Sequence, residues 1–129
     1  MPEAILIVDD NIDNQELTRF LLEGEGFDVR VAEDADSALK TLQTYHPRLI
    51  LMDIQLPKMD GLELTRRLRQ KPTLQSVIIV ALSAYAMKSD KDNARAAGCD
   101  GYITKPIDTR TFVDVVRGYL EVFDPTPAA

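Results

Sequence analysis

Carboxylates stand at the ends of two short apolar runs of the chain. Asp9 and Asp10 follow Ala4–Val8, and Asp53 follows the apolar residues Leu49–Met52. Adjacent carboxylates repel each other, and burying them is unfavourable unless something offsets their charge. If the fold brings the three together, they suit a hard cation with oxygen ligands, and Mg²⁺ fits a set of ligands that leaves room for waters.

Two further polar residues end apolar runs later in the chain. Ser83 follows Val77–Leu82, and Lys105 follows Gly101–Thr104 and precedes Pro106. A bound metal lowers the cost of clustering anions. A metal, a lysine and a hydroxyl around a carboxylate form a site for phosphoryl transfer, in which a carboxylate oxygen attacks in line.

Short apolar runs alternate with amphipathic segments along the whole chain. We expect strands at Ala4–Val8, Phe27–Ala32, Arg48–Asp53, Val77–Leu82 and Gly101–Thr104. We expect helices at Ile12–Glu23, Ala35–Tyr45, Gly61–Gln70, Met87–Ala97 and Thr109–Leu120. Asp34 and Asp60 are expected to cap helices at their N-termini, and Gly26 and Gly98 fall where helices end.

Five β-α units in alternation predict an α/β fold, a single five-stranded parallel sheet with five helices on both faces. In the flavodoxin-like strand order 2-1-3-4-5, ligands bind beyond the carboxyl ends of strands 1 and 3. This order would bring Asp9, Asp10 and Asp53 to one crevice. We expect one domain over residues 4–121 and a short flexible C-terminal tail over 122–129.

The composition argues against several partners. The net charge is −6, from 15 Lys and Arg against 21 Asp and Glu, which disfavours a nucleic-acid-binding domain. The basic residues Arg66, Arg67, Arg69 and Lys71 are interpreted as a solvated helix face. The chain has one cysteine, no apolar run of membrane-spanning length and no basic segment before its first strand. We therefore expect a cytoplasmic protein with no membrane contact.

The polar residues and their spacing resemble the receiver domain of two-component response regulators. The matching segments are Asp9-Asp10-Asn11, Asp53 within LILMDIQLPKMDG, Ser83-Ala84, and Lys105-Pro106, with Tyr102 three residues before the lysine. The resemblance covers residues 4–121. Its finer features look most like stand-alone receivers of the DivK type.

The resemblance implies a phosphoacceptor and a set of metal ligands. Asp53 is implied as the phosphoacceptor. Asp10 and Asp53 are implied as direct Mg²⁺ ligands, Asp9 as a ligand through a bound water, and Gln55 as a ligand through its backbone carbonyl.

The resemblance also implies the groups that contact the phosphoryl oxygens and report the modification. Lys105 would neutralise the acyl phosphate, and the Lys105–Pro106 bond would be cis and direct the lysine inward. Ser83 would hydrogen-bond a phosphoryl oxygen, and Tyr102 would change rotamer when Ser83 moves.

Gln55 and Tyr85 are assigned from chemistry instead, because these two positions are less fixed in the family. The amide of Gln55 could orient a hydrolytic water, and Tyr85 could screen the site. We hypothesise that the two residues set the lifetime of phosphorylated Asp53.

The helix expected at Met87–Ala97 has few apolar residues, chiefly Met87, Ala94 and Ala97. Little burial implies low local stability, so this helix suits a two-state element beside the site. It would share an output face with the fifth strand and the last helix, where Val115 lies off the core stripe.

The resemblance implies a phosphorylation-controlled signalling module that turns over no separate metabolite. The phosphoryl group would come from a histidine kinase or a histidine phosphotransfer protein, which would meet the helix from Ile12 and the loop at Pro106. A downstream protein would read the change, since we expect no attached output domain. Whether activation also forms a homodimer is left open.

The sequence also allows other functions to be weighed. A haloacid-dehalogenase-type phosphohydrolase would carry an Asp two residues after its nucleophile, where this chain has Gln55. A flavodoxin-like flavin protein would need a Gly-rich phosphate loop, which Asp9 and Asp10 would repel. A degenerate, never-phosphorylated receiver is disfavoured because every chemical group is present.

Overall fold

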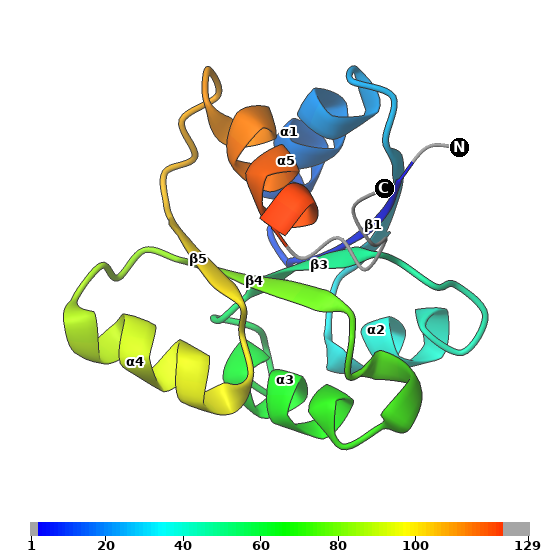
Figure 1. Ribbon diagram of the computed structural model, residues 1–129, viewed down its shortest axis with the longest axis vertical. Coiled ribbons are helices and arrows are strands. Elements are labelled where there is room, and N and C mark those ends of the chain that lie inside the picture. The colour runs from blue at the N-terminus through cyan, green and yellow to red at the C-terminus, as the bar shows by residue number, and fades with distance from the viewer. Residues whose placement is uncertain (1–2, 123–129) are drawn as a thin grey trace.

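The computed structural model describes residues 3–122 as one parallel sheet with helices on both faces (Figure 1). The strands are β1 (Ala4–Val8), β2 (Asp28–Ala32), β3 (Leu49–Asp53), β4 (Ile78–Ser83) and β5 (Gly101–Thr104). The helices are α1 (Ile12–Glu23), α2 (Ala35–Thr41), α3 (Gly61–Arg69), α4 (Lys88–Ala97) and α5 (Phe112–Val122), with a short 3₁₀ helix η1 (Pro72–Leu74). The strand order is β2-β1-β3-β4-β5, which confirms the predicted topology.

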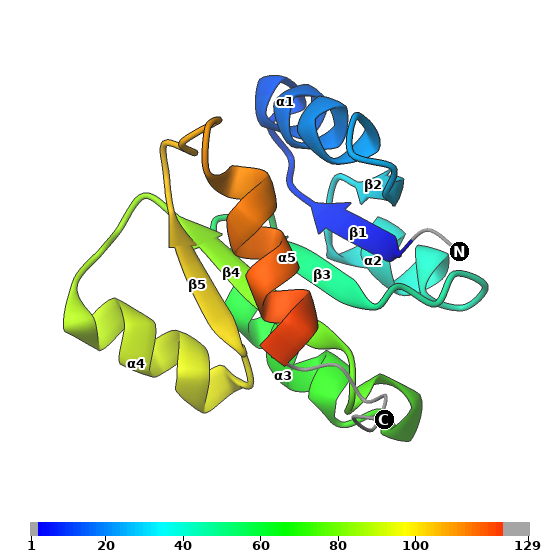
Figure 2. The same cartoon turned by 45° about the horizontal axis from the view of Figure 1, so that its top comes forward.

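Side-chain alternation along the central strands divides the apolar core into two layers. Leu6 and Ile50 face α2, α3 and α4, whereas Ile7 and Leu51 face α1 and α5. Figures 1 and 2 show the same arrangement, with α1 and α5 on one side of the sheet. Because β1, β3 and β4 are covered on both faces, their residues are apolar up to the polar residues Asp53 and Ser83, which end β3 and β4.

Two predicted helices have different bounds in the structure. Helix α2 ends at Thr41 instead of Tyr45, because the chain tightens into i→i−3 hydrogen bonds before Pro47. Helix α5 begins at Phe112 instead of Thr109, because Asp108 holds the preceding residues in a turn through its own carboxylate. The other predicted bounds differ by one residue or none, apart from the end of α5.

The predicted caps are largely confirmed. Asp34 accepts a hydrogen bond from the backbone N–H of Ser37, and Asp60 accepts one from Glu63. Gly98 ends α4 with φ of 112°. Gly24, not Gly26, is the C-cap of α1.

The predicted C-terminal tail, 122–129, lies outside the described residues except for its first member. Val122 is the last residue of α5. The ordered helix therefore extends past residue 121, where we expected the domain to end.

Candidate functional site

Asp9 comes directly after β1 and is fully buried. Its backbone N–H donates to Ala32 of β2 at 3.0 Å, which extends the sheet pairing past the strand end. Its carboxylate oxygen Oδ1 accepts the backbone N–H of Asn11 at 2.9 Å. Gln15, in the first turn of α1, donates its side-chain amide to the Asp9 carbonyl at 2.5 Å. The turn that carries both carboxylates is thus fixed from β2 and from α1.

Asp53 is the last residue of β3, and 2% of its surface is exposed. Its Oδ1 accepts the backbone N–H of Gln55 at 3.0 Å, and its Oδ2 lies 3.0 Å from Nζ of Lys105. A Cβ on Gly61 would lie 2.2 Å from the Asp53 carbonyl oxygen, so the N-terminus of α3 rests directly on the Asp53 backbone. One carboxylate oxygen of Asp53 therefore lies beside Lys105, the lysine that was predicted to neutralise the acyl phosphate.

The three predicted carboxylates meet in one place. One oxygen from each of Asp9, Asp10 and Asp53 lies within 4.8 Å of the others, and Asp10 is exposed while the other two are buried. Within residues 3–122, Oδ2 of Asp9 has no hydrogen-bond partner, and Nζ of Lys105 is 3.9 Å away, too far for a hydrogen bond. A buried, unpartnered carboxylate oxygen beside two more carboxylates fits a hard divalent cation such as Mg²⁺.

Burial makes the ionised form of Asp9 unfavourable. Its pKa rises from 3.8 to about 6, chiefly because of burial. The hydrogen bond from Asn11 lowers the pKa, the negative charge of Asp53 raises it, and the positive charge of Lys105 lowers it. The single lysine does not compensate for two buried carboxylates.

The three residues predicted to report or tune the modification on the β4 side are linked through the backbone of Tyr85. The Tyr85 N–H donates to Oγ of the buried Ser83 at 3.1 Å. The Tyr85 carbonyl accepts the hydroxyl of Tyr102 at 2.7 Å. A movement of Ser83 that displaces the Tyr85 backbone would therefore change the hydrogen bond between the Tyr102 hydroxyl and the Tyr85 carbonyl.

The two residues assigned to phosphoryl lifetime contact each other. The side-chain amide of Gln55 donates to the Tyr85 hydroxyl at 3.2 Å, and both side chains are on the exposed side of the site. The sequence suggested the two residues separately. In the structure this hydrogen bond connects the loop after β3 with the loop after β4.

The Lys105–Pro106 peptide bond is cis, and the backbone N–H of Lys105 donates to the Ser83 carbonyl at 2.7 Å. The ends of β4 and β5 are thus joined immediately beside the lysine. In the structure its ammonium group points into the carboxylate cluster.

Sequence reasoning missed two residues that support the site. Gln15 was not singled out, and its only signal was its place in the first turn after the Asp pair. Arg69 was interpreted as part of a solvated face, but its guanidinium group donates to the carbonyls of Gly98 and Val77 and contacts Asp100. Arg69 thus ties α3 to the C-terminal end of α4 and the start of β4, a long-range contact without a sequence signal.

Comparisons with known proteins agree on the family. Residues 5–117 match the response regulator receiver domain. The chain is 39% identical over 120 residues to the polar-differentiation response regulator DivK of Brucella anthropi, covering 93% of this chain and 98% of that one.

Solved structures agree as well. A putative response regulator from Chloroflexus aurantiacus is 32% identical with a TM-score of 0.88, covering 94% of this chain and 99% of that one. The chemotaxis response regulator CheY4 of Vibrio cholerae is 25% identical with a TM-score of 0.89, covering 93% and 100%.

The comparisons give no support to the phosphohydrolase alternative. Within residues 3–122, every helix is too short or too polar to cross a membrane.

The family match and the DivK relative both span nearly the whole chain, and the strand order is the one that the resemblance implied. The chain therefore belongs to the response regulator receiver domain family.

Proposed function

We propose that this chain is a single-domain response regulator that accepts a phosphoryl group on Asp53 and changes its protein-binding surface. The donor is a phosphohistidine of a histidine kinase or a phosphotransfer protein, and the reaction takes place in the cytoplasm. The chain catalyses only its own phosphorylation and dephosphorylation. The observation that carries this proposal is the convergence of three carboxylates and Lys105 on the carboxyl ends of β1, β3 and β5.

Each residue of the site has a part in the transfer. A carboxylate oxygen of Asp53 forms a bond to phosphorus while the bond from phosphorus to the histidine nitrogen breaks, and the histidine leaves neutral after taking up a proton. Lys105, already 3.0 Å from Asp53, balances charge on the transferred group. Asp10, Asp53 and the Gln55 carbonyl would hold Mg²⁺ directly, and Asp9 through a water; the ion supplies positive charge that stabilises the phosphoryl oxygens.

The change at Asp53 is relayed through Ser83. A new phosphoryl group offers strong acceptors and attracts the Ser83 hydroxyl. Ser83 then leaves the Tyr85 N–H, the loop after β4 shifts, and the Tyr102 hydroxyl loses the Tyr85 carbonyl. The rotamer of Tyr102 thereby reports the state of Asp53.

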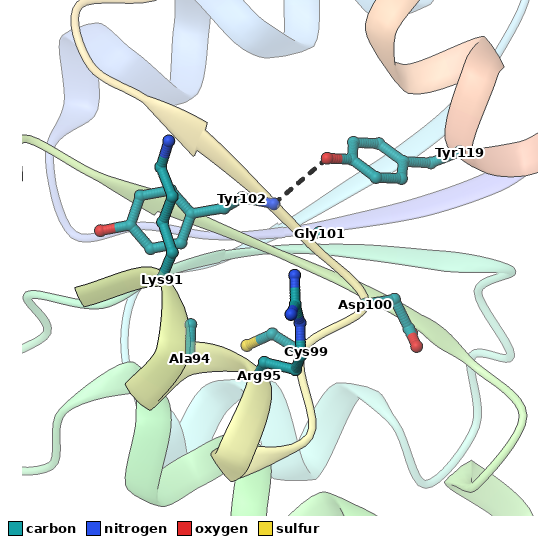
Figure 3. A pocket seen from close by; sticks show the side chains of 8 residues that line it. All are labelled: Lys91, Ala94, Arg95, Cys99, Asp100, Gly101, Tyr102 and Tyr119. Atoms are coloured by element: carbon teal, nitrogen blue, oxygen red, sulfur yellow. Dashed lines mark hydrogen bonds between the residues drawn. The ribbon is translucent and has the colours of Figure 1, made fainter. Parts of the chain in front are cut away.

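The surface that changes lies between α4, β5 and α5 (Figure 3). A pocket of about 240 Å³ opens there, with Lys91 and Arg95 of α4 on one side and Tyr119 of α5 on the other. Tyr119 accepts the backbone N–H of Tyr102 at 3.2 Å, which covers the outer edge of β5. Helix α4 buries only Ala94 and Ala97, so its position is weakly held. A downstream protein would read this surface.

The intact mass of the protein after incubation with Mg²⁺ and a small acyl-phosphate donor tests the proposal, with Asp53→Asn as the control. We expect one phosphoryl adduct, absent without Mg²⁺ and absent in the variant. If neither the small donor nor a purified histidine kinase of the same organism produces an adduct on Asp53, the proposed function is wrong.

A further inference from the structure

A groove of about 510 Å³ lies at the amino ends of β3 and β4, the end of the sheet opposite to Asp53. Helix α2 and the connection from α3 to β4 form its two sides, and Figure 1 shows both below the sheet. Its floor is aliphatic and its rim is exposed. The floor consists of Leu39, Leu42 and Leu74, and the rim of Gln43, His46, Lys71 and Thr73. We call it the α2–η1 groove.

The chain around this groove is basic, although the protein as a whole is acidic. Residues 37–52 and 64–89 contain none of the 21 acidic residues, and both sides of the groove come from these two segments. The cations of the two segments are Lys40, Arg48, Arg66, Arg67, Arg69, Lys71 and Lys88. The acidic residues are therefore concentrated elsewhere in the molecule.

The arginines of this region already have partners, whereas the groups around the groove do not. Arg48 pairs with Glu3, and Arg69 pairs with Asp100. Within residues 3–122, no ion pair or hydrogen bond engages the side chains of Lys40, His46 or Lys71. Lys71 at the rim and Lys40, the residue after Leu39, thus leave positive charge unbalanced beside the aliphatic floor.

We propose that the α2–η1 groove docks an acidic segment of a partner protein, with leucine or phenylalanine side chains on the floor and carboxylates at the rim. Apolar floors with a charged rim are typical of protein-recognition sites. A nucleic acid fits less well, because its phosphates gain nothing from an aliphatic floor and are repelled by a net charge of −6.

The groove is independent of the phosphoryl switch and goes beyond the proposed function. The five residues of β3 separate it from Asp53, which at about 3.3 Å per residue is on the order of 15 Å. None of the residues linked to Ser83 lines it. Docking at this surface therefore holds a partner in both states of Asp53.

The experiment uses the isotope-labelled full chain and a synthetic helical peptide as the probe. The peptide has about 15 residues, with leucines at i and i+4 on one face and glutamates elsewhere. Titration followed by NMR should give a saturable change with a Kd below about 200 µM. The largest shifts should fall on residues 39–46 and 71–74, and Asp53→Asn should bind equally.

Matched variants distinguish binding in the groove from a general effect of the protein's net charge. Lys71→Glu should weaken binding at least fivefold, because it replaces attraction by repulsion at the rim. Lys88→Glu changes the net charge equally but lies at α4, outside the groove, and should change the Kd less than twofold. Control peptides carry lysine for each glutamate or alanine for each leucine, and neither should bind. Circular dichroism verifies that each variant is folded.

Several outcomes would overturn the proposal. They are the absence of saturable binding, equal loss in Lys71→Glu and Lys88→Glu, and shifts that centre on the α4–β5–α5 surface. Tighter binding of a DNA or RNA oligonucleotide at the same residues would make the groove a nucleic-acid site. Concentration-dependent shifts of those residues without peptide would make a second copy the occupant. None of these outcomes bears on phosphorylation of Asp53.

Discussion

Asp9 combines full burial with an oxygen that lacks a hydrogen-bond partner among the described residues. A carboxylate with a raised pKa binds a proton in competition with a metal. Asp9 therefore couples metal binding to pH in the range just below neutrality, although its predicted contact with the ion is only through a water.

We predict that the affinity for Mg²⁺ falls as the pH drops through about 6, the pKa of Asp9. Protonation removes a negative charge from the cluster, so the apparent Kd should rise about tenfold between pH 7 and pH 5. NMR titration with Mg²⁺ at several pH values measures this. Asp9→Asn should bind Mg²⁺ more weakly at pH 7 and show a flatter pH profile. An unchanged profile in the variant would assign the titration to another group.

A second prediction concerns the hydrogen bond between Gln55 and Tyr85. In the structure the Tyr85 hydroxyl engages the amide that we expect to orient a hydrolytic water. Tyr85→Phe should free this amide and speed the decay of phosphorylated Asp53 about threefold, the value of one modest hydrogen bond. In a Gln55→Ala background the same substitution should have no effect. The decay followed by intact mass tests this coupling, and independent effects of the two substitutions would contradict it.

At the scale of elements, α3 is placed by the absence of a side chain at Gly61. The N–H of Gly61 donates to the Ile54 carbonyl at 2.7 Å, and a Cβ would collide with the backbone of Asp53. The close approach fixes the loop that leaves the phosphoacceptor. Glycine is therefore required here for its size, since its φ is not positive.

Gly61→Ala should lower the free energy of unfolding by about 2–4 kcal/mol, because backbone atoms cannot yield as a flexible side chain can. Gly118→Ala is the matched control, since a Cβ there meets nothing within 4 Å. In the interior of α5 that substitution should instead stabilise the protein by about 0.5–1 kcal/mol. Urea unfolding of both variants measures the difference, and equal effects would mean that α3 can move away from β3.

The elements were predictable where a local rule decides them. Apolar runs without alternation identify β1, β3 and β4, and the polar residue after each run identifies the sheet edge that forms the site. Contacts between distant segments were not predictable. The pairing of Gln55 with Tyr85 and the contacts of Arg69 with the α4–β5 connection depend on where loops meet, which no periodicity encodes.

At the scale of the whole molecule, the clustered carboxylates that suit a metal ion also lower the stability of the metal-free folded chain. Asp9 has a higher pKa in the folded chain than in the unfolded one, so its contribution to stability is greatest at low pH. That contribution falls as the pH rises between about 4 and 6. Above pH 6 the ionised, buried group therefore lowers the free energy of unfolding.

Asp9→Asn should therefore raise the melting temperature of the metal-free protein at pH 7.5, and the gain should shrink towards pH 4 as Asp9 becomes protonated.

Mg²⁺ should stabilise the native chain, because it binds only the folded cluster. At ten times its Kd the gain is about 1.4 kcal/mol, a rise of about 3–6 °C for a domain of this size. In Asp9→Asn combined with Asp53→Asn the rise should vanish. Thermal unfolding with and without Mg²⁺ measures both effects. A wild-type melting temperature that is insensitive to the ion would separate the carboxylate cluster from metal binding altogether.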